Sequence, residues 1–595
     1  MRRLFAFVGM LALVAMSGCS DSDSVRSNES VYRHSMDGAP VTLDPAQSSV
    51  VYTSFVVVNV YDTLFSFKYL ARPYELKLNL AESWPDISQD GRVYTIKLKP
   101  GVRFIDDEAF PEGQGREVVA ADVVYSLLRH FDPSVRAQGA WLWQGRIEGL
   151  DEWKDAGADY DAPPTGLSAV DAHTLKVTLN EPYPQLLFTL AQGFAGIVPR
   201  EAVEHYGRQF ATHPVGSGPF MLDRFSTTKA VLVRNPDFRQ EPFDLEAEGY
   251  DPAVHDTYGV AKFAGQSPPF VDRIEIDFVE ETAARWNSFT KGREIQFTNV
   301  PREQADSVLA SRNPLRLESE YSDQYHALIA PEAGFVYSGF NMADEAIGYH
   351  DDPTQNERNR ALRCAIRSAF DWEERNRTFY FGIGQVFPGI ITPVVPEFDS
   401  AMSPSSVTQD VAAAKKLLAD HGWTAENIPT LEYGSPSNLT NRQQYEQFRG
   451  FMEQIGVPTA KVKLKSFPTF GDFNRAMKQR ELMIFSLGWI LDYPDAENTL
   501  QLFYGPNETP GSNNFNYINP EFDELFDRTK VMQPSPERTA LYRQMNQMIV
   551  DECVAITGLS RTRIYLWHKN VVGFPDREIV GGYWLRYVGL DQNPS

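Results

Sequence analysis

Cys364 and Cys553 carry thiols that could do redox chemistry, because two thiols in an oxidising compartment can join as a disulfide. Neither thiol lies in a Cys-x-x-Cys pair or in a spacing typical of a zinc site. The sequence therefore leaves two alternatives open. They form one disulfide in an exported protein, or they are two separate thiols buried on helices.

The third cysteine, Cys19, closes a segment that is typical of a bacterial lipoprotein signal. Arg2 and Arg3 give a positive start, an apolar run follows over residues 4–16, and Met-Ser-Gly-Cys at 16–19 forms the cleavage box. The run is too short to span a bilayer. We predict a signal peptide over residues 1–18, a lipid on Cys19 and a polar tether over residues 19–30. The alternative is an ordinary cleaved signal or a membrane-buried start.

Serine, histidine and carboxylate groups occur without matching a catalytic motif. Ser217 lies between two glycines but lacks the Gly-x-Ser-x-Gly elbow, and the sequence has no His-Glu-x-x-His and no phosphate-binding glycine loop. The acid pairs at 106–107 and 351–352 are of a kind that is usually solvated, and His350 beside the second pair could bind a cation. We therefore expect no enzyme, no cofactor and no metal site, and a periplasmic hydrolase is the less favoured alternative.

Composition limits the classes of protein to which this chain could belong. The chain has 595 residues, of which 42% are hydrophobic and 12% aromatic, enough for a large core and two to four domains. Its formal net charge of −23 repels phosphate backbones, so nucleic-acid binding is disfavoured. Beyond the N-terminal run, no apolar stretch reaches membrane-spanning length.

Strand and helix patterns that must position any site are interspersed along the chain. Alternating apolar residues predict strands around 94–98, 175–179 and 274–278. Helices are predicted after the N-caps Asp410 and Ser535. Strands and helices mix without a strict βαβ rhythm, which favours an α/β fold with mixed sheets.

Short blocks of sequence, in a fixed order, carry a resemblance to a known family. The blocks are Leu43-Asp44-Pro45, Val60-Tyr61-Asp62-Thr63-Leu64, Leu80-Ala81-Glu82-Ser83-Trp84, residues 90–98, Gly101-Val102-Arg103-Phe104, residues 121–126, residues 214–220, Arg234-Asn235-Pro236, Gly339-Phe340-Asn341, residues 359–371, and Gly488-Trp489 with Asp492-Tyr493. From Thr42 to Phe574 the chain resembles the large extracytoplasmic solute-binding proteins of ABC importers, family 5, which includes the dipeptide and oligopeptide binders.

The resemblance implies an α/β clamp of two lobes with mixed sheets and an extra inserted domain near the N-terminus. We predict the core of lobe I at 31–70, 196–335 and 556–595, the inserted domain at 71–195 and lobe II at 336–555. A ligand is expected in the cleft between the lobes, buried when they close about a hinge.

Asp492 is the residue to which the resemblance gives the clearest role. A protein that binds many peptides must hold their backbone and charged ends, and a buried α-ammonium needs a carboxylate partner. In peptide-binding relatives an aspartate at this position has that role. The alternative is that Asp492 only begins a turn over 492–495. Asp495 is a second candidate, but as a turn residue it is expected to be solvated.

Backbone groups on both sides of the ligand follow from the same resemblance. The expected residues are Gly488, Trp489 and Ile490 on one side, and Ser49, Val50 and Val51 on the other. Trp489 could also stack against ligand side chains, or it could be a core aromatic near the hinge.

The resemblance implies a monomeric, extracytoplasmic protein, held to the inner or outer membrane by its lipid. It would capture a peptide-like solute and deliver it to an ABC permease, whose ATPase supplies the energy. Segments 111–116, 241–269 and 343–359 are longer than in the best-known peptide binders, so the ligand class stays open. Alternatives are a nickel chelate, haem, an oligosaccharide or an opine, or a role as a surface sensor or chaperone.

Overall fold

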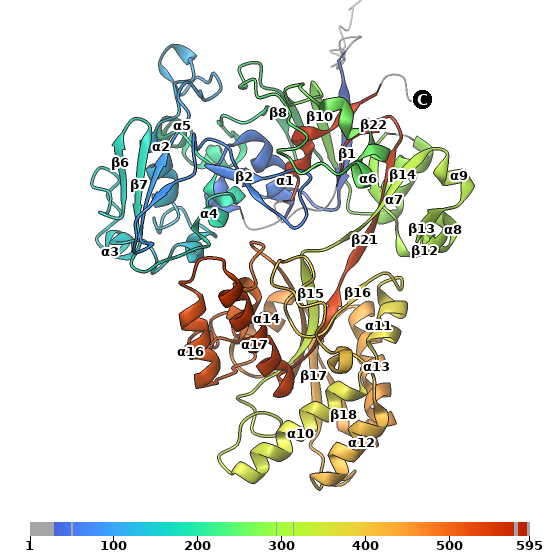
Figure 1. The fold of residues 1–595 in the computed structure, drawn as a ribbon. Coiled ribbons are helices and arrows are strands. Elements are labelled where there is room, and N and C mark those ends of the chain that lie inside the picture. The colour runs from blue at the N-terminus through green and yellow to red at the C-terminus, as the bar shows by residue number, and fades with distance from the viewer. Residues whose placement is uncertain (1–28, 49–50, 293, 313, 576–580, 592–595) are drawn as a thin grey trace, which may run out of the picture.

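The structure is a computed structural model that describes residues 29–48, 51–292, 294–312, 314–575 and 581–591. It has two lobes, which Figure 1 shows one above the other with strands running between them. The mixed sheets and the two lobes agree with the predicted fold class. Residues 1–18, the lipidation site Cys19 and most of the tether lie outside the described residues, and the predicted domain boundaries stay predictions.

Lobe I contains a four-stranded mixed sheet in the order β1-β10-β9-β8. β1 is parallel to β10, and the other neighbours are antiparallel. Alternate side chains of β10 face the core, so Ile274 and Ile276 are fully buried. The strands are β1 (Val31–Met36), β8 (Phe220–Phe225), β9 (Lys229–Arg234) and β10 (Arg273–Phe278).

The inserted domain has its own antiparallel sheet, in the order β4-β5-β7-β6. Tyr94 and Ile96 on β5 face the same side as Leu175 and Val177 on β7, and all four are buried. Helix α2 (Ala120–Leu128) packs on β6 and β7. The strands are β4 (Asp86–Ile87), β5 (Val93–Lys97), β6 (Leu167–Asp171) and β7 (Thr174–Thr178).

Lobe II is built on a six-stranded sheet in the order β16-β20-β15-β19-β17-β18. β17 is parallel to both of its neighbours, and β15 is antiparallel to β19 and β20. The strands are β15 (Gly334–Phe340), β16 (Gln385–Val386), β17 (Leu431–Pro436), β18 (Val462–Phe467), β19 (Ile484–Ile490) and β20 (Ala555–Ser560). Its longer helices are α10 (Pro353–Ala369), α11 (Trp372–Phe379), α12 (Val411–Asp420), α13 (Leu439–Gln454), α14 (Phe470–Lys478), α16 (Pro520–Thr529) and α17 (Pro536–Asp551).

Two strand pairs cross between the lobes. β14 (Tyr325–Pro331) continues into β15, and β20 continues into β21 (Thr562–His568); β11 (Phe297–Asn299), β21 and β14 form one sheet in lobe I. At the crossing, the buried carboxylate of Glu332 accepts from Arg561 Nε at 2.7 Å and from Arg563 Nε at 3.0 Å. These hydrogen bonds link the two crossing segments to each other.

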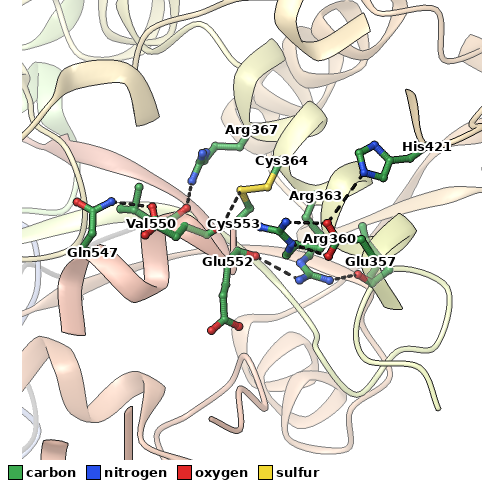
Figure 2. Close-up of a disulfide and its surroundings, with 12 residues drawn as sticks. Glu357, Arg360, Arg363, Cys364, Arg367, His421, Gln547, Val550, Glu552 and Cys553 are labelled. Carbon is green, nitrogen blue, oxygen red and sulfur yellow. Dashed lines mark hydrogen bonds and ion pairs between the residues drawn. A yellow bond between two sulfur atoms is a disulfide. The ribbon is translucent and has the colours of Figure 1, made fainter. Parts of the chain in front are cut away.

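The structure joins Cys364 and Cys553 in a disulfide with an S–S distance of 2.04 Å, deciding between the alternatives that the sequence left open. Figure 2 shows three arginines of α10 beside it. They donate to backbone carbonyl oxygens at the C-terminal end of α17: Arg360 to Asp551, Arg363 to Glu552 and Arg367 to Val550. Cationic groups favour a helix C-terminus, so the disulfide and the arginines hold the same two elements together.

Local signals behave as the sequence predicts at the helix starts. Asp410 accepts from the N–H of Ala413 at 2.8 Å, and Ser535 accepts from that of Arg538 at 3.1 Å. The segment 241–269 forms short helical turns that are packed into lobe I. No helix in the described ranges combines the length and the apolar character that crossing a bilayer requires.

Candidate functional site

β19 presents an open backbone edge at its C-terminal end. It pairs with β15 from Ile484 to Ile490, whereas β17 pairs only with Ile484 and Phe485. Within the described part of the chain, residues 486–490 therefore have no strand partner on the side away from β15. Gly488 and Ile490 are exposed there. An extended ligand backbone could add to this edge as a further strand.

Asp492 follows this edge directly, and its carboxylate has no cationic partner among the described residues. Its Oδ2 atom accepts from Asn498 Nδ2 at 3.1 Å, and the side chain is only partly exposed. Burial raises the pKa of Asp492 to about 6, and the hydrogen bond from Asn498 opposes that shift. The site can therefore accept a cation, whose positive charge would favour the ionised form of Asp492.

Asn498, in α15 (Glu497–Leu500), is a residue of this site that the sequence did not reveal. It is fully buried, and its Oδ1 atom accepts from Trp489 Nε1 at 2.9 Å and from the N–H of Asp492 at 3.2 Å. One amide thus fixes both the indole ring and the aspartate. The sequence alone could not predict this contact, because an asparagine six residues after an aspartate is a common spacing. Only the turn between the two residues brings Asn498 to Asp492.

Asp495 is buried, so the prediction that it would be solvated is wrong. Its Oδ2 atom lies 2.8 Å from Arg538 Nη2, and the same nitrogen lies 3.2 Å from Glu397 Oε1. Arg538 comes from α17, which packs against α15. Of the two carboxylates in this turn, Asp495 has an internal cation and Asp492 has none.

The loop that carries Asp492 is in contact with the segment that follows the inserted sheet. Gln192 Nε2 donates to the backbone carbonyl of Asp492. Phe188, in α4 (Leu186–Thr189), stacks on Tyr493 with ring centroids 6.5 Å apart. The loop of lobe II that carries Asp492 therefore contacts the segment that holds Phe188 and Gln192.

A cavity of about 690 Å³ lies nearer the hinge. Its walls are formed by β1, α1 (Val51–Val60), α7 (Thr282–Asn287), β11 and β21, together with Phe381 of lobe II. Asp492 and residues 488–490 do not line it. Val51 begins α1, one residue before the cavity residue Tyr52; Ser49 and Val50 lie outside the described residues. The role predicted for residues 49–51 stays a prediction.

Other residues of the sequence blocks are structural. Arg129 binds both carboxylate oxygens of Asp44, at 2.8 and 2.6 Å, and both side chains are buried. Ser217 is buried and its hydroxyl donates to Asp62 Oδ2 at 3.1 Å, which gives it a structural role. A Cβ on the neighbouring Gly216 would lie 2.1 Å from the carbonyl oxygen of Val60, which only a glycine avoids.

Side chains that could bind a metal do not cluster in the part of the chain that the structure describes. Among the described residues, no group of three or more His, Cys, Asp or Glu side chains is arranged to hold a metal ion. His350 Nδ1 accepts from the backbone N–H of Asp352 at 3.0 Å, at the start of α10.

Comparison with known proteins gives consistent matches over most of the chain. The model of the family described as "Bacterial extracellular solute-binding proteins, family 5 Middle" matches residues 75–511. The glutathione-binding protein GsiB of Escherichia coli K12 is 23% identical over 544 residues, covering 90% of this chain and 89% of that protein. A dipeptide-binding protein of Pseudomonas aeruginosa is 24% identical over 555 residues, covering 90% and 91%.

Solved structures share the two-lobed fold. HbpA2 from Haemophilus parasuis matches with a TM-score of 0.73 and 21% identity, covering 94% of this chain and 100% of that chain. The periplasmic binding protein DppA from Helicobacter pylori, in complex with the peptide STSA, matches with a TM-score of 0.67 and 20% identity, covering 94% and 98%.

Proposed function

The chain belongs to family 5 of the bacterial extracellular solute-binding proteins, the binding components of ABC importers, and we propose that this member captures a peptide-like solute by its free amino terminus at Asp492. The ligand's backbone pairs with the open edge of β19, and its α-ammonium pairs with the carboxylate. No covalent bond of the ligand changes.

The observation that carries this proposal is the unpaired carboxylate of Asp492. A partly buried aspartate without an internal cation is costly, and its raised pKa reflects that cost. It stands at the end of an exposed strand edge, where a ligand's first residue would arrive. The names of the relatives, a glutathione-binding and a dipeptide-binding protein, support a ligand of this size and chemistry.

Delivery follows from lobe closure. A ligand that contacts both lobes binds the closed form better, so it shifts the population toward closure. The ABC permease would recognise the closed form, and its ATPase would supply the energy for import. A lipid on Cys19 would keep the extracytoplasmic protein close to that permease. Replacing the acceptor thiol by Cys19→Ser should move the protein from the membrane to the soluble fraction; persistence at the membrane would contradict the anchor.

Native mass spectrometry of the protein as purified tests the ligand proposal. We expect the wild type to carry a ligand with the mass of a short peptide, and Asp492→Ala to lose most of it. Glu453→Ala is the matched control, because Glu453 is an exposed carboxylate on α13 of the same lobe. A ligand without an amine, such as an oligosaccharide, or full retention by Asp492→Ala would reject the proposal.

A further inference from the structure

A second cavity, of about 380 Å³, lies within lobe II at the C-terminal ends of β17 and β18. Its volume is within the range of small-ligand sites. It shares no lining residue with the cavity beside the hinge, and neither Asp492 nor residues 486–490 line it. The capture of a peptide-like solute at Asp492 therefore leaves this cavity without a role.

The topology of lobe II places this cavity where open α/β sheets bind ligands. The chain runs from β17 through α13 to β18 on one side of β17, and then from β18 through α14 to β19 on its other side. Tyr433 of β17 packs on Phe448 of α13. Phe467 of β18 packs on Phe473 of α14, so the two helices cover opposite faces of the sheet (Figure 1). The loops after β17 and β18 therefore leave the sheet in opposite directions, and ligands of such sheets bind in the crevice between loops of this kind.

Three serine hydroxyls line the cavity, and none of them has a hydrogen bond among the described residues: those of Ser435, Ser437 and Ser466. Ser435 and Ser466 are register partners on the parallel strands β17 and β18, so their side chains lie beside each other on the same face. Ser435 is only 3% exposed. A hydroxyl that is almost fully buried costs free energy unless it has a hydrogen-bond partner, so Ser435 indicates a ligand in this cavity.

The N-terminus of α13 adds donors to the same cavity. The side chain of Asn438 caps the helix by accepting from the N–H of Asn441 at 2.7 Å. The N–H groups of Leu439 and Thr440, which begin the helix, have no acceptor in the part of the chain that the structure describes. α13 has 16 residues, and its aligned peptide dipoles give this end a partial positive charge. A helix N-terminus of this kind favours an anion.

The one charged group of the described residues that line the cavity is a cation. The guanidinium of Arg442, in the first turns of α13, lines the cavity and forms no ion pair or hydrogen bond with another described side chain. No carboxylate is among these lining residues, although the chain has 79 acidic residues and a formal net charge of −23. Hydroxyl and N–H donors beside a guanidinium, with no acid among them, form a surface that attracts an anion.

We propose that this cavity binds a phosphate group, as the free ion or as a small phosphomonoester, at a second ligand site that goes beyond the function proposed above. The hydroxyls, the N–H groups of the helix and the guanidinium together supply more donors than the two oxygens of a carboxylate accept. A phosphate group has three strong acceptor oxygens even as a monoester, and it pairs with arginine in bidentate fashion. Leu439 and Leu464 leave an apolar wall for the organic part of an ester.

Isothermal titration calorimetry with inorganic phosphate tests the proposal, on protein prepared in a phosphate-free buffer and at constant ionic strength. We expect the wild type to bind one phosphate per chain, and to bind acetate about tenfold more weakly or less. Ser435→Ala and Arg442→Gln should each weaken phosphate binding about tenfold or more, because each removes a donor to a charged oxygen. Glycerol 3-phosphate, titrated in parallel, identifies the source: tighter binding than that of phosphate assigns a monoester, and weaker binding assigns the free ion.

Arg449→Gln and Ser405→Ala are the matched controls and should keep the wild-type affinity. Arg449 lies further along α13, Ser405 is an exposed serine of lobe II, and neither lines the cavity. Absence of phosphate binding by the wild type, equal affinity for acetate, or wild-type affinity in either cavity variant would overturn the inference. Asp492→Asn should bind phosphate as the wild type does. A loss in that variant would place the phosphate at the proposed peptide site, and the inference of a second site would fail.

Discussion

Asp62 in lobe I and Asp492 in lobe II are both aspartates removed from bulk water, but their surroundings differ. Asp62 is fully buried and forms two ion pairs. Its Oδ2 atom lies 2.7 Å from Arg239 Nη1, and its Oδ1 atom lies 3.3 Å from Arg586 Nη1. Asp492 accepts from Asn498 Nδ2 at 3.1 Å, and no arginine or lysine among the described residues forms an ion pair with it. A carboxylate with two internal cations holds a fold together, whereas one without any is prepared for a cation from outside.

The pKa values of the two groups shift in opposite directions. Burial alone would raise both. At Asp62 the guanidinium groups of Arg239 and Arg586 outweigh burial and hold the pKa below its usual value. At Asp492 burial prevails and raises the pKa to about 6. The comparison separates a structural carboxylate from a receptive one by the presence of an internal cationic partner.

The largest expected effect concerns stability. Asp62→Ala should lower the free energy of unfolding by about 3–5 kcal/mol, because it leaves two guanidinium groups buried without a counter-charge. Asp492→Ala removes one hydrogen bond and should change it by about 1 kcal/mol or less. Denaturant titration of both ligand-free variants measures this. Equal losses in the two variants would remove the distinction between the two aspartates.

The next effect concerns ligand affinity at the receptive site. Asn498→Ala should weaken binding of a free-amine peptide about tenfold, because Trp489 and Asp492 both lose the amide that fixes them. Isothermal titration calorimetry measures the affinity. Gln443→Ala, an exposed amide on α13, is the control and should leave it unchanged. Wild-type affinity in Asn498→Ala would mean that Asp492 is oriented by other contacts.

The smallest effect is the pH dependence of binding. The affinity for an amine ligand should fall as the pH drops through about 6, because protonated Asp492 no longer attracts an ammonium group. The pH dependence of stability runs the other way, because a raised pKa means that protonation of Asp492 favours the folded state. A loss of affinity over this pH range would therefore not result from unfolding. Calorimetry from pH 7 to pH 5 should show the fall in the wild type, and a flat profile there would contradict the assignment.

The sequence predicted the family and the fold because ordered blocks of residues survive at low identity. The same blocks singled out Asp492, whose role stays a prediction. The sequence could not tell Asp62 from Asp492, since the partners of Asp62 lie 177 and 524 residues away along the chain. The same reason hid the burial of Asp495, whose cation comes from Arg538 on another helix. Local signals such as the caps at Asp410 and Ser535 were predictable because donor and acceptor lie three residues apart.

The central claim is that Asp492 pairs with the amino terminus of the ligand. Its most direct test compares the affinity for a peptide that the protein carries with that for the same peptide acetylated at its amino terminus, in the wild type and in Asp492→Asn. We expect the wild type to prefer the free amine by about 30-fold or more, corresponding to about 2 kcal/mol or more, and Asp492→Asn to bind both equally. Equal affinity of the wild type for the two peptides would contradict the account.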